Sequence, residues 1–517
     1  MSSLSTAFAE QKIEKSLSSK LLLTAVLAPL LLAGAMQLGK AARSVAASGD
    51  NTYPESAVVQ TAIWAKTSGR IYPSLDSSPY TPAPYGPLFY LALTGLAKLG
   101  KLNFDSLLVA GRVASLTFYL LIVIAAYLWE RRHMQSTLAL MAPALILAQV
   151  DFVDWIVTVR PDLGALTLTM GALMLVSSQR PSWKNIAAVG LLCGFSGVIK
   201  QSYIALPLAT VLWLLWSRRW KWACIFAGTT ALAGGSVMTL LTLKHEPFLN
   251  EMLLARYSPL SFTAAVQLLK ADMVQYPLQM VLLGLACLGL QSLPAEEDFN
   301  LRPLMASYLA LAWLMGFYTA MAPGASTNAF LESWILSALL APLAFARIAK
   351  YWPTVPVGVR GLLLVLWLSI VIVTLDRWRV IFTGPNAGVQ KLAQLAKGRR
   401  VLTDFPYVAA HSLQPEMLDP SVNHYLELGG HWSSQPVLNE LRTRLFDYVI
   451  IGESNGAPRS WRGLTLFSAS ILREVEQDYQ PLCQADRFMI YARRGEQFNI
   501  QTDSALLKGS GCKQISR

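Results

Sequence analysis

Charged residues are scarce in this sequence. Only 14% of its 517 residues are Asp, Glu, Lys or Arg, whereas 54% are hydrophobic. Soluble domains carry about 25% charged residues, because charged side chains keep their surfaces in water. A chain with so little charge lacks the polar surface of a water-soluble protein of this size. The composition therefore argues against a cytosolic or secreted globular enzyme.

Cysteine is also scarce, with five residues. Cys193, Cys224 and Cys287 fall in apolar runs, where cysteine packs as a small apolar side chain. Cys483 and Cys512 fall in the more polar C-terminal segment, where a disulfide between them stays open. The histidines show no metal-ligand spacing, so no zinc site is expected. No Gly-rich P-loop is present, which argues against an ATP-driven pump.

Long apolar runs are what the sequence has instead, bounded by charges or by Pro and Gly. Read with a window of about 19 residues, they predict a polytopic all-α membrane protein with about eleven spans. The expected spans lie near 21–39, 109–129, 136–150, 163–179, 185–199, 203–217, 222–243, 277–293, 304–320, 329–346 and 358–376. Several are shorter than the ~20 residues of a perpendicular span, which indicates broken helices that line a site.

Much of the net charge of +12 comes from Lys and Arg residues in the short loops between the apolar runs. With the N-terminus inside, the inner segments hold far more Lys and Arg than the short outer loops, as the positive-inside rule requires. These inner residues are Lys12, Lys15, Lys20, Arg131, Arg132, Arg180, Lys184, Arg218, Arg219, Lys221, Arg302, Arg347, Lys350 and Arg360. We expect a cell (inner) membrane protein with a cytoplasmic N-terminus, and an odd number of spans places the C-terminal segment outside.

Residues 40–108 form an outer segment that is too long for a simple connection, and its aromatic and Pro content favours an ordered, functional loop. A helix is expected to start at Thr52-Tyr53-Pro54-Glu55, with Pro at the first helical position and an acid in the first turn. Apolar Val58, Val59, Ala62 and Ile63 recur at helical spacing and Gly69 ends the run, which predicts an amphipathic helix on the outer leaflet. A Pro-rich aromatic stretch follows at 79–87. The run from Leu88 to Leu99 is too short to span and predicts an interfacial or re-entrant helix.

Residues 377–517 differ from the rest, because hydrophobicity falls and charge rises. Strand-like runs at 400–403, 448–451 and 488–491 alternate with helix-like stretches such as 437–446. We therefore divide the chain into a transmembrane domain at 1–376, which includes the outer loop 40–108, and an α/β extracytoplasmic domain at 377–517.

Ionisable and polar residues gather at the expected outer face, where burial near a membrane makes them expensive to keep. They are Asp50, Glu55, Arg112, Asp151, Asp154, Arg160, Asp162, Lys200, Gln201, Asn328 and Glu332. Each also has a plainer interpretation. Glu55 is placed to complement a helix dipole, Arg160 and Asp162 to form a local ion pair, and Lys200 or Arg112 to anchor a helix at the interface.

The order of motifs in the outer loop resembles GT-C glycosyltransferases that use polyprenyl-phosphate sugars. It is most similar to the branch with protein O-mannosyltransferases, lipid A aminoarabinose transferases and lipopolysaccharide-core transferases. The matching pieces, in chain order, are Tyr53-Pro54-Glu55, Gly69, Tyr85-Gly86-Pro87-Leu88-Phe89-Tyr90, Arg112, Arg160-Pro161-Asp162, and the run from Gly324 through Asn328 to Glu332. The resemblance covers most of the chain and implies a GT-C fold.

Two departures from the family pattern matter. The family opens its outer loop with an acid pair, whereas here Pro54 stands in place of the first acid and Asp50 is the nearest Asp. Tyr85 replaces the Lys of the Pro-rich element, a residue similar to one that would hold lipid phosphate. Phosphate binding then falls to another cation, with Arg160 and Lys200 as the leading candidates.

The resemblance implies an inverting transfer of a sugar from a polyprenyl-phosphate donor to an extracytoplasmic lipid, glycan or protein. A carboxylate must take the proton of the acceptor hydroxyl, and cations must stabilise the departing phosphate. We predict Glu55 as the base with Asp50 as the alternative, and Arg160 with Lys200 as the phosphate clamp. The other substrate-binding candidates are Asp162, Arg112, Tyr85, Gln201, Asn328 and Glu332.

No cofactor is required by this prediction, no metal ligand is assigned, and a role for a divalent metal stays open. No nucleic-acid partner is expected. Two other classes stay open beside the enzyme: a secondary transporter or lipid flippase, which would show internal repeats, and a non-catalytic protein of envelope assembly. The sequence does not name the sugar, the prenyl chain or the acceptor.

Overall fold

The structure is a computed structural model. The described ranges are 17–52, 55–75, 80–134, 137–149, 153–178, 182–244, 260–293, 300–322, 325–381, 387–413, 418–454, 457–458, 460–461, 464–485, 487–495 and 513–514. Tyr53, Pro54, Asp151, Gly324 and Cys512, which the sequence singled out, lie outside these ranges, and so does the side chain of Asp154.

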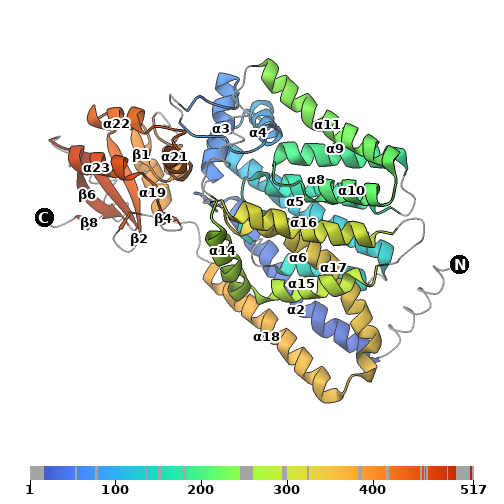
Figure 1. The fold of residues 1–517 in the computed structure, drawn as a ribbon. Coiled ribbons are helices and arrows are strands. Elements are labelled where there is room, and N and C mark those ends of the chain that lie inside the picture. Colours follow the sequence, from blue (N-terminus) through green and yellow to red (C-terminus); the bar gives the residue numbers. More distant parts are fainter. Residues whose placement is uncertain are drawn as a thin grey trace.

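Residues 17–381 form a bundle of helices (Figure 1). Its elements are α2 (Leu17–Val45), α3 (Glu55–Ser68), α4 (Pro87–Leu99), α5 (Phe104–His133), η1 (Leu138–Leu140), α6 (Met141–Ala148), α7 (Val153–Ile156), α8 (Pro161–Val176), α9 (Trp183–Ile199), α10 (Ala205–Trp216), α11 (Trp220–Leu243), α14 (Phe262–Gln275), α15 (Pro277–Leu290), α16 (Arg302–Ala320), η3 (Thr327–Phe330), α17 (Leu331–Tyr351), η4 (Trp352–Thr354) and α18 (Val357–Ile381).

Each of the eleven apolar segments expected from the sequence contains a helix. Among the described residues, five helices are long and apolar enough to cross a membrane, or six if α14 and α15 form one broken span. The remaining apolar helices, such as α8, α9 and α10, are shorter. The chain is therefore a mainly helical, multi-pass membrane protein, while the count of eleven spans stays a prediction.

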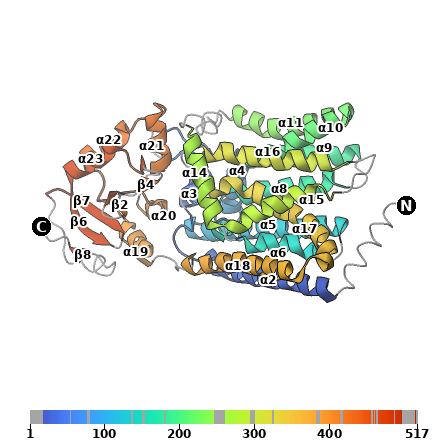
Figure 2. The same ribbon diagram turned by 60° about the horizontal axis from the view of Figure 1, so that its bottom comes forward.

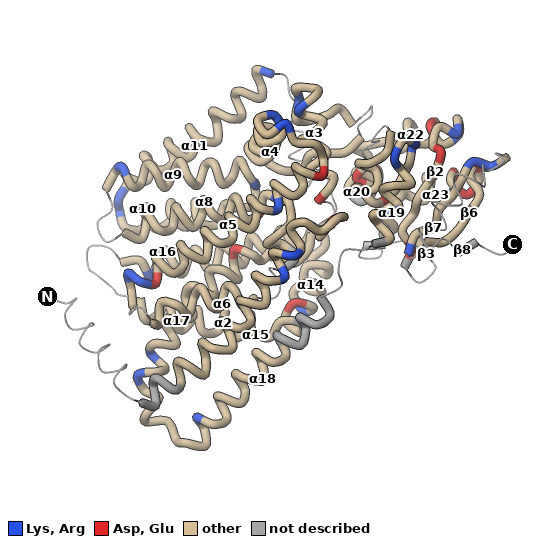
Figure 3. The backbone as a smooth tube through the Cα atoms, turned by 180° about the vertical axis from the view of Figure 1, so that it is seen from behind, with Lys and Arg blue, Asp and Glu red and all other residues tan. Residues whose placement is uncertain are grey.

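The outward face of the bundle is apolar. On α5, Val113, Leu121 and Ile124 are exposed, and α18 exposes Leu362 and Val365 in the same way. Helices can present such faces to lipid because all their backbone hydrogen bonds are internal. Lys and Arg lie at several helix ends remote from the C-terminal segment (Figure 3), and exposed Trp216 and Trp220 flank Arg218 and Arg219 there. The side of the membrane on which each end lies stays a prediction.

Glycines bring pairs of helices into close contact. On α9, a Cβ at Gly190 would lie 2.7 Å from the carbonyl oxygen of Phe226 on α11, and one at Gly194 would lie 2.6 Å from that of Thr230. On α15, a Cβ at Gly289 would lie 2.2 Å from the carbonyl oxygen of Leu340 on α17. Small residues spaced four apart allow this approach, since packing drives helix association in lipid.

The outer segment 40–108 contains two helices and the loop between them. The expected helix is present as α3, and Gly69 follows it with φ +77. Protein covers α3 from Glu55 to Ala62, because α4, α5 and the C-terminal segment pack around it. Helix α4 buries one face and exposes Leu91, Leu96 and Leu99 on the other, as an interfacial helix would. We call residues 80–86, which precede α4, the strap.

The C-terminal segment contains a six-stranded sheet of order β1-β2-β7-β6-β8, with β3 paired to β2, and a separate pair β4-β5. Its strands are β1 (Val401–Thr403), β2 (Tyr448–Ser454), β3 (Ala457–Pro458), β4 (Ser460–Trp461), β5 (Leu464–Thr465), β6 (Tyr479–Ala485), β7 (Phe488–Arg493) and β8 (Lys513–Gln514). Its helices are α19 (Ala387–Ala396), α20 (Pro406–Ala409), α21 (Pro420–Leu428), α22 (Gln435–Arg442) and α23 (Ala469–Asp478).

The three strand runs expected from the sequence are β1, β2 and β7, which are neighbours in the sheet. Strand β1 pairs parallel to β2, whereas β7 pairs antiparallel to both β2 and β6. Cys483 on β6 takes part in a disulfide, and Cys512 lies outside the described residues. The sheet and its helices lie at one end of the bundle, beside α3 and α4 (Figures 1 and 2). The division of the chain at residue 376 stays a prediction.

Gly86 sets the position of the strap against α9. A Cβ on Gly86 would lie 1.8 Å from the carbonyl oxygen of Val198, so a larger residue forces backbone to move. We expect Gly86→Ala to destabilise the protein by about 1–3 kcal/mol, as overpacking does. Gly95→Ala on α4 is the matched control, because nothing lies within 4 Å of its Cβ and helix propensity favours Ala by about 0.5–1 kcal/mol.

Thermal unfolding of the purified protein in detergent measures both variants. A Gly86→Ala variant as stable as the Gly95→Ala control would contradict the close packing of the strap on α9.

Candidate functional site

Glu55 and Arg112 form a buried ion pair in the outer half of the bundle. Arg112 Nε donates to Glu55 Oε1 at 2.9 Å and Nη2 donates to Oε2 at 2.7 Å, and both side chains are 0% exposed. The same guanidinium donates to the backbone carbonyls of Ala47 and of Gly49. The planar fork of Arg suits such a bidentate contact. The pair therefore ties the end of α2, the start of α3 and the middle of α5 together.

The Glu55 carboxylate accepts two further hydrogen bonds from backbone. Asn51 N donates to Oε2 at 3.0 Å, and Val159 N donates to Oε1 at 2.8 Å. Each oxygen thus holds two donors from the protein. This satisfied carboxylate is a structural junction, and a substrate hydroxyl would have to displace a protein donor to reach it.

Asp50 stands beside this junction with a different environment. Its Oδ1 accepts from Ser56 N at 2.8 Å, whereas its buried Oδ2 has no hydrogen-bond partner within the described part of the chain. Burial and the nearby Glu55 carboxylate raise the Asp50 pKa to about 7. A carboxylate with one open oxygen and a pKa near neutrality has the properties of a general base.

The segment 157–160 connects this acidic group to a cluster of cations. Asn51 Nδ2 donates to Val157 O at 2.8 Å, and Thr52 Oγ1 donates to Thr158 Oγ1 at 3.4 Å. The next residues along the segment are Val159, which binds Glu55, and Arg160. Asp50 and Arg160 therefore belong to two neighbouring, hydrogen-bonded stretches of backbone.

Arg160 precedes α8 and lies among aromatic rings. Its Nη2 donates to the Tyr85 hydroxyl at 2.5 Å, and its guanidinium carbon lies 4.9 Å from the Trp155 ring centroid and 5.6 Å from that of Tyr85. Burial raises the pKa of the Tyr85 hydroxyl, an effect that Arg160 opposes and that Asp162 and Asp419 increase. Tyr85 thus holds a cation through its hydroxyl and its ring.

Asp162 lies between Arg160 and Lys200. The Lys200 ammonium contacts Asp162 Oδ1, Asn328 Nδ2 donates to the same oxygen at 3.0 Å, and Arg160 Nε lies 3.7 Å from Oδ2. Lys200 follows the last turn of α9 and leans over the Tyr203 ring at 5.5 Å. Residues from α8, α9 and η3 therefore meet in one charged cluster.

The remaining candidates lie around this cluster. Gln201 Nε2 donates to Pro84 O in the strap at 2.9 Å. Glu332 accepts from the Tyr308 hydroxyl at 2.9 Å and is close enough to act electrostatically on Lys200. Figure 3 shows how few charges otherwise lie within the bundle. The ten candidate side chains thus form two groups, one around Glu55 and one around Asp162, joined by the segment 157–160.

Sequence reasoning missed Trp155, Tyr308 and Asp419. Trp155 Nε1 donates to Thr327 Oγ1 at 3.1 Å and so connects the Arg160 region to η3. Tyr308 lies in the apolar run of α16, where only its hydroxyl group could have indicated a polar contact. Asp419 precedes Pro420 as a helix cap, which says nothing about the side chains that its charge reaches.

The C-terminal segment holds the other end of the strap. Asn423 Nδ2 donates to Tyr80 O at 2.9 Å, and the Tyr80 hydroxyl donates to Glu440 Oε1 at 3.1 Å. Trp432 Nε1 donates to Leu75 O at 3.1 Å in the preceding stretch. The strap therefore runs from α21 and α22 at Tyr80 to the charged cluster at Tyr85.

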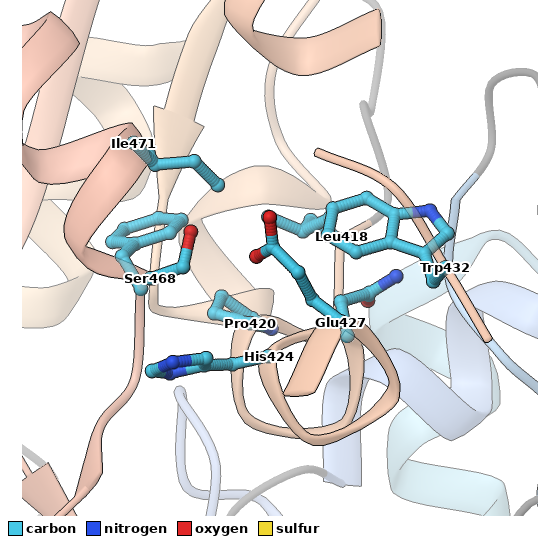
Figure 4. A pocket seen from close by; sticks show the side chains of 9 residues that line it. Leu418, Pro420, His424, Glu427, Trp432, Ser468 and Ile471 are labelled. Carbon is cyan, nitrogen blue, oxygen red and sulfur yellow. The ribbon is translucent and has the colours of Figure 1, made fainter. Parts of the chain in front are cut away.

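A small pocket lies within the C-terminal segment itself (Figure 4). Its lining residues are Leu418, Pro420, Asn423, His424, Glu427, Trp432, Phe467, Ser468 and Ile471. The Glu427 carboxylate lies between Ser468 and Trp432 (Figure 4), and its Oε1 accepts from the Ser434 hydroxyl. None of the ten candidate residues lines this pocket, so it is separate from the charged cluster.

The described carboxylates around the site do not form a metal-ligand set. Within the described ranges, no group of three His, Cys, Asp or Glu side chains is close enough to hold an ion. Glu55 is occupied by Arg112 and two backbone amides, and Asp162 by Lys200 and Asn328. We therefore derive no step through a metal.

Comparison with known proteins gives its result at the level of fold. No family model matches the chain, and no curated protein matches it in sequence. Crystal structures of ArnT from Cupriavidus metallidurans are similar to it with a TM-score of 0.56, in the apo state and bound to undecaprenyl phosphate. The sequence identities are 11% and 10%, and the matches cover 89% and 90% of this chain and 97% and 98% of those chains.

A weaker similarity, with a TM-score of 0.45 and 10% identity, is to an Archaeoglobus fulgidus oligosaccharyltransferase, over 92% of this chain and 74% of that one. The match to ArnT spans both the helical bundle and most of the C-terminal segment. It agrees with the motif order in the outer loop. The chain therefore has the GT-C fold of membrane glycosyltransferases.

Proposed function

We propose that this chain is a membrane glycosyltransferase that transfers a sugar from a polyprenyl-phosphate donor to an acceptor hydroxyl outside the cytoplasm. The observation that carries the proposal is the position of Asp50, whose buried Oδ2 has no hydrogen-bond partner among the described residues. Asn51, next to Asp50, is hydrogen-bonded to the backbone segment that leads to Arg160, and Arg160 and Lys200 both contact Asp162. A base and a phosphate clamp are the two parts that such a transfer needs. The ArnT structure with undecaprenyl phosphate supports a lipid phosphate as the ligand of this fold.

In the proposed reaction, the acceptor oxygen forms a bond to the anomeric carbon while the bond from that carbon to the phosphate oxygen breaks. The electron pair stays on the leaving phosphate, and Asp50 Oδ2 takes the acceptor proton. Arg160 and Lys200 stabilise the charge that develops on the phosphate. Attack from the face opposite the phosphate inverts the anomeric centre.

Between the two acids that the sequence left open, the environment favours Asp50 as the base. Glu55 holds four donors from the protein, whereas Asp50 keeps one oxygen open. Glu55 then acts as a positioning residue, because it fixes Arg112, Asn51 and Val159 around Asp50. An acceptor hydroxyl would have to displace one of these four donors before it could reach a Glu55 oxygen.

Asp50→Asn and Glu55→Gln separate these two roles. We expect Asp50→Asn to lower the transfer rate by about 10²–10⁴-fold with little change in thermal stability. Glu55→Gln leaves a buried Arg112 without its counter-charge and should cost about 3–5 kcal/mol of stability. Transfer from a polyprenyl-phosphate sugar to an acceptor, measured together with thermal unfolding, tests both expectations.

The double variant Glu55→Gln/Arg112→Gln provides the control. It removes both buried charges, so it should recover part of the stability that Glu55→Gln loses. Full transfer activity in the Asp50→Asn variant would contradict the assignment of Asp50 as the base. Activity lost in Glu55→Gln at unchanged stability would return the role to Glu55.

The Asp50 pKa of about 7 predicts the pH dependence of transfer. A general base works only when it is deprotonated, so its raised pKa removes activity as the pH falls below about 7. The rate at low donor concentration should drop about tenfold per pH unit below that point and level off above it. A rate profile that stays flat from pH 5 to pH 8 would contradict Asp50 as the base.

Lys200 should contribute directly to phosphate binding. We expect Lys200→Gln to weaken binding of a polyprenyl phosphate by about tenfold or more, because a charge-assisted contact is lost. The exposed Lys221→Gln, in the first turn of α11, is the matched control and should bind like the wild type. Titration of the lipid against the protein in nanodiscs measures both, and equal affinities in the two variants would remove Lys200 from the clamp.

A further inference from the structure

One carboxylate, Asp162, contacts both cations of the proposed clamp. Lys200 and Asn328 reach its Oδ1, and Arg160 Nε lies 3.7 Å from its Oδ2. The Asp162 side chain is only 2% exposed, and those of Lys200 and Arg160 are 9% and 13% exposed. Water therefore screens these charges poorly, and each charge strongly affects its neighbours.

The position of Asp162 has a plain structural explanation that covers part of the observation. An acid in the first turn of α8 complements the helix dipole, and any carboxylate there would do so. That role requires neither Lys200 from α9 nor Asn328 from η3. In addition to its role at the start of α8, Asp162 therefore contributes a negative charge to a cluster that also contains Lys200 and Arg160.

Among the described residues, the charges in direct contact are the two positive ones of Arg160 and Lys200 and the negative one of Asp162. Further negative charge reaches the cluster from Glu332, which acts on Lys200, and from Asp419, which acts on Arg160. The cluster is therefore able to attract an anion, but each additional negative charge meets Asp162 at close range. Without Asp162, the same two cations would hold a strongly anionic ligand much more tightly.

The proposed substrate and product differ in this respect. The donor is a phosphodiester with one negative charge, whereas the lipid phosphate that leaves is a monoester with about −1.5 to −2 charges at pH 7. Both have similar phosphate oxygens and the same lipid tail. A fixed negative charge in the site therefore raises the free energy of the bound product more than that of the bound donor.

We infer that Asp162 sets the charge of the phosphate site so that it binds the singly charged donor and releases the more highly charged lipid phosphate. This inference rests on the proposed function. Asp162 is then a positioning residue with a second effect, because it holds Arg160 and Lys200 in place and also limits how strongly they retain the product. The selectivity between diester and monoester is the measurable quantity.

Two lipids test it on the full chain in nanodiscs: undecaprenyl phosphate, a monoester, and its methyl phosphodiester. The ratio of their dissociation constants reports the selectivity. We expect Asp162→Asn to shift this ratio toward the monoester by about tenfold, because one unit of opposing charge is gone. Asp162→Glu keeps the charge and should keep the wild-type ratio.

Asn328→Asp places an added negative charge beside Asp162, whose Oδ1 the Asn328 amide contacts, and should shift the ratio the other way, toward the diester. If Asp162→Asn does not fold, the ratio of dissociation constants measured for Asn328→Asp tests the inference instead. Thermal unfolding is recorded for every variant. A purely structural role of Asp162 would lower stability and weaken both lipids equally, and an unchanged ratio would overturn the inference.

The wild type separates this result from failure of the proposed function. If it binds neither lipid, the proposed function is wrong and the inference falls with it. If it binds both lipids but Asp162→Asn and Asn328→Asp leave their ratio unchanged, only the role of Asp162 is wrong.

Discussion

The ion pair of Glu55 and Arg112 is the interaction on which the rest of the site depends. Two unscreened charges are expensive to bury, and here each is surrounded by partners from the protein. The pair joins α5, which carries Arg112, to two stretches of chain that are far apart in sequence: the connection from α2 to α3, and the segment before α8. Asp50 and Arg160 lie on these two stretches, so their relative position is decided by a contact that neither of them makes.

A second constraint acts at the strap. Pro84 and Tyr85 are fixed against α8 and α9 by Gln201 and Arg160, while Tyr80 is fixed by side chains of α21 and α22. Gly86 allows the strap to touch the backbone of α9. The cation cluster therefore has one wall supplied by the outer segment and held from two sides. Tyr85 contributes to this wall through its contact with Arg160.

The sequence predicted much of the helical bundle, because apolar runs and flanking charges follow directly from the requirements of lipid. It also predicted α3, whose end Gly69 marked, and it predicted strands β1, β2 and β7 from their β-branched and aromatic residues. The spacing of apolar residues does not predict which groups will pair with a buried charged side chain. The motif therefore favoured Glu55 as the base. The choice between Glu55 and Asp50 depends on which carboxylate keeps an oxygen without a protein donor. That in turn depends on Asn51, Arg112 and Val159, which donate to Glu55. Tyr308 and Asp419 were missed for the same reason, since each acts through contacts distant in sequence.

The two bonds at Tyr80 also set an order of events in synthesis. Their partners, Asn423 and Glu440, are 343 and 360 residues further along the chain. The bundle helices can enter the membrane and pack long before these partners leave the ribosome, because domains form progressively from the N-terminus. The strap gains its outer support only when the final quarter of the chain has folded. A truncated or unfinished chain would thus have all its membrane helices and both groups of charged residues, yet its outer wall would be held at one end only.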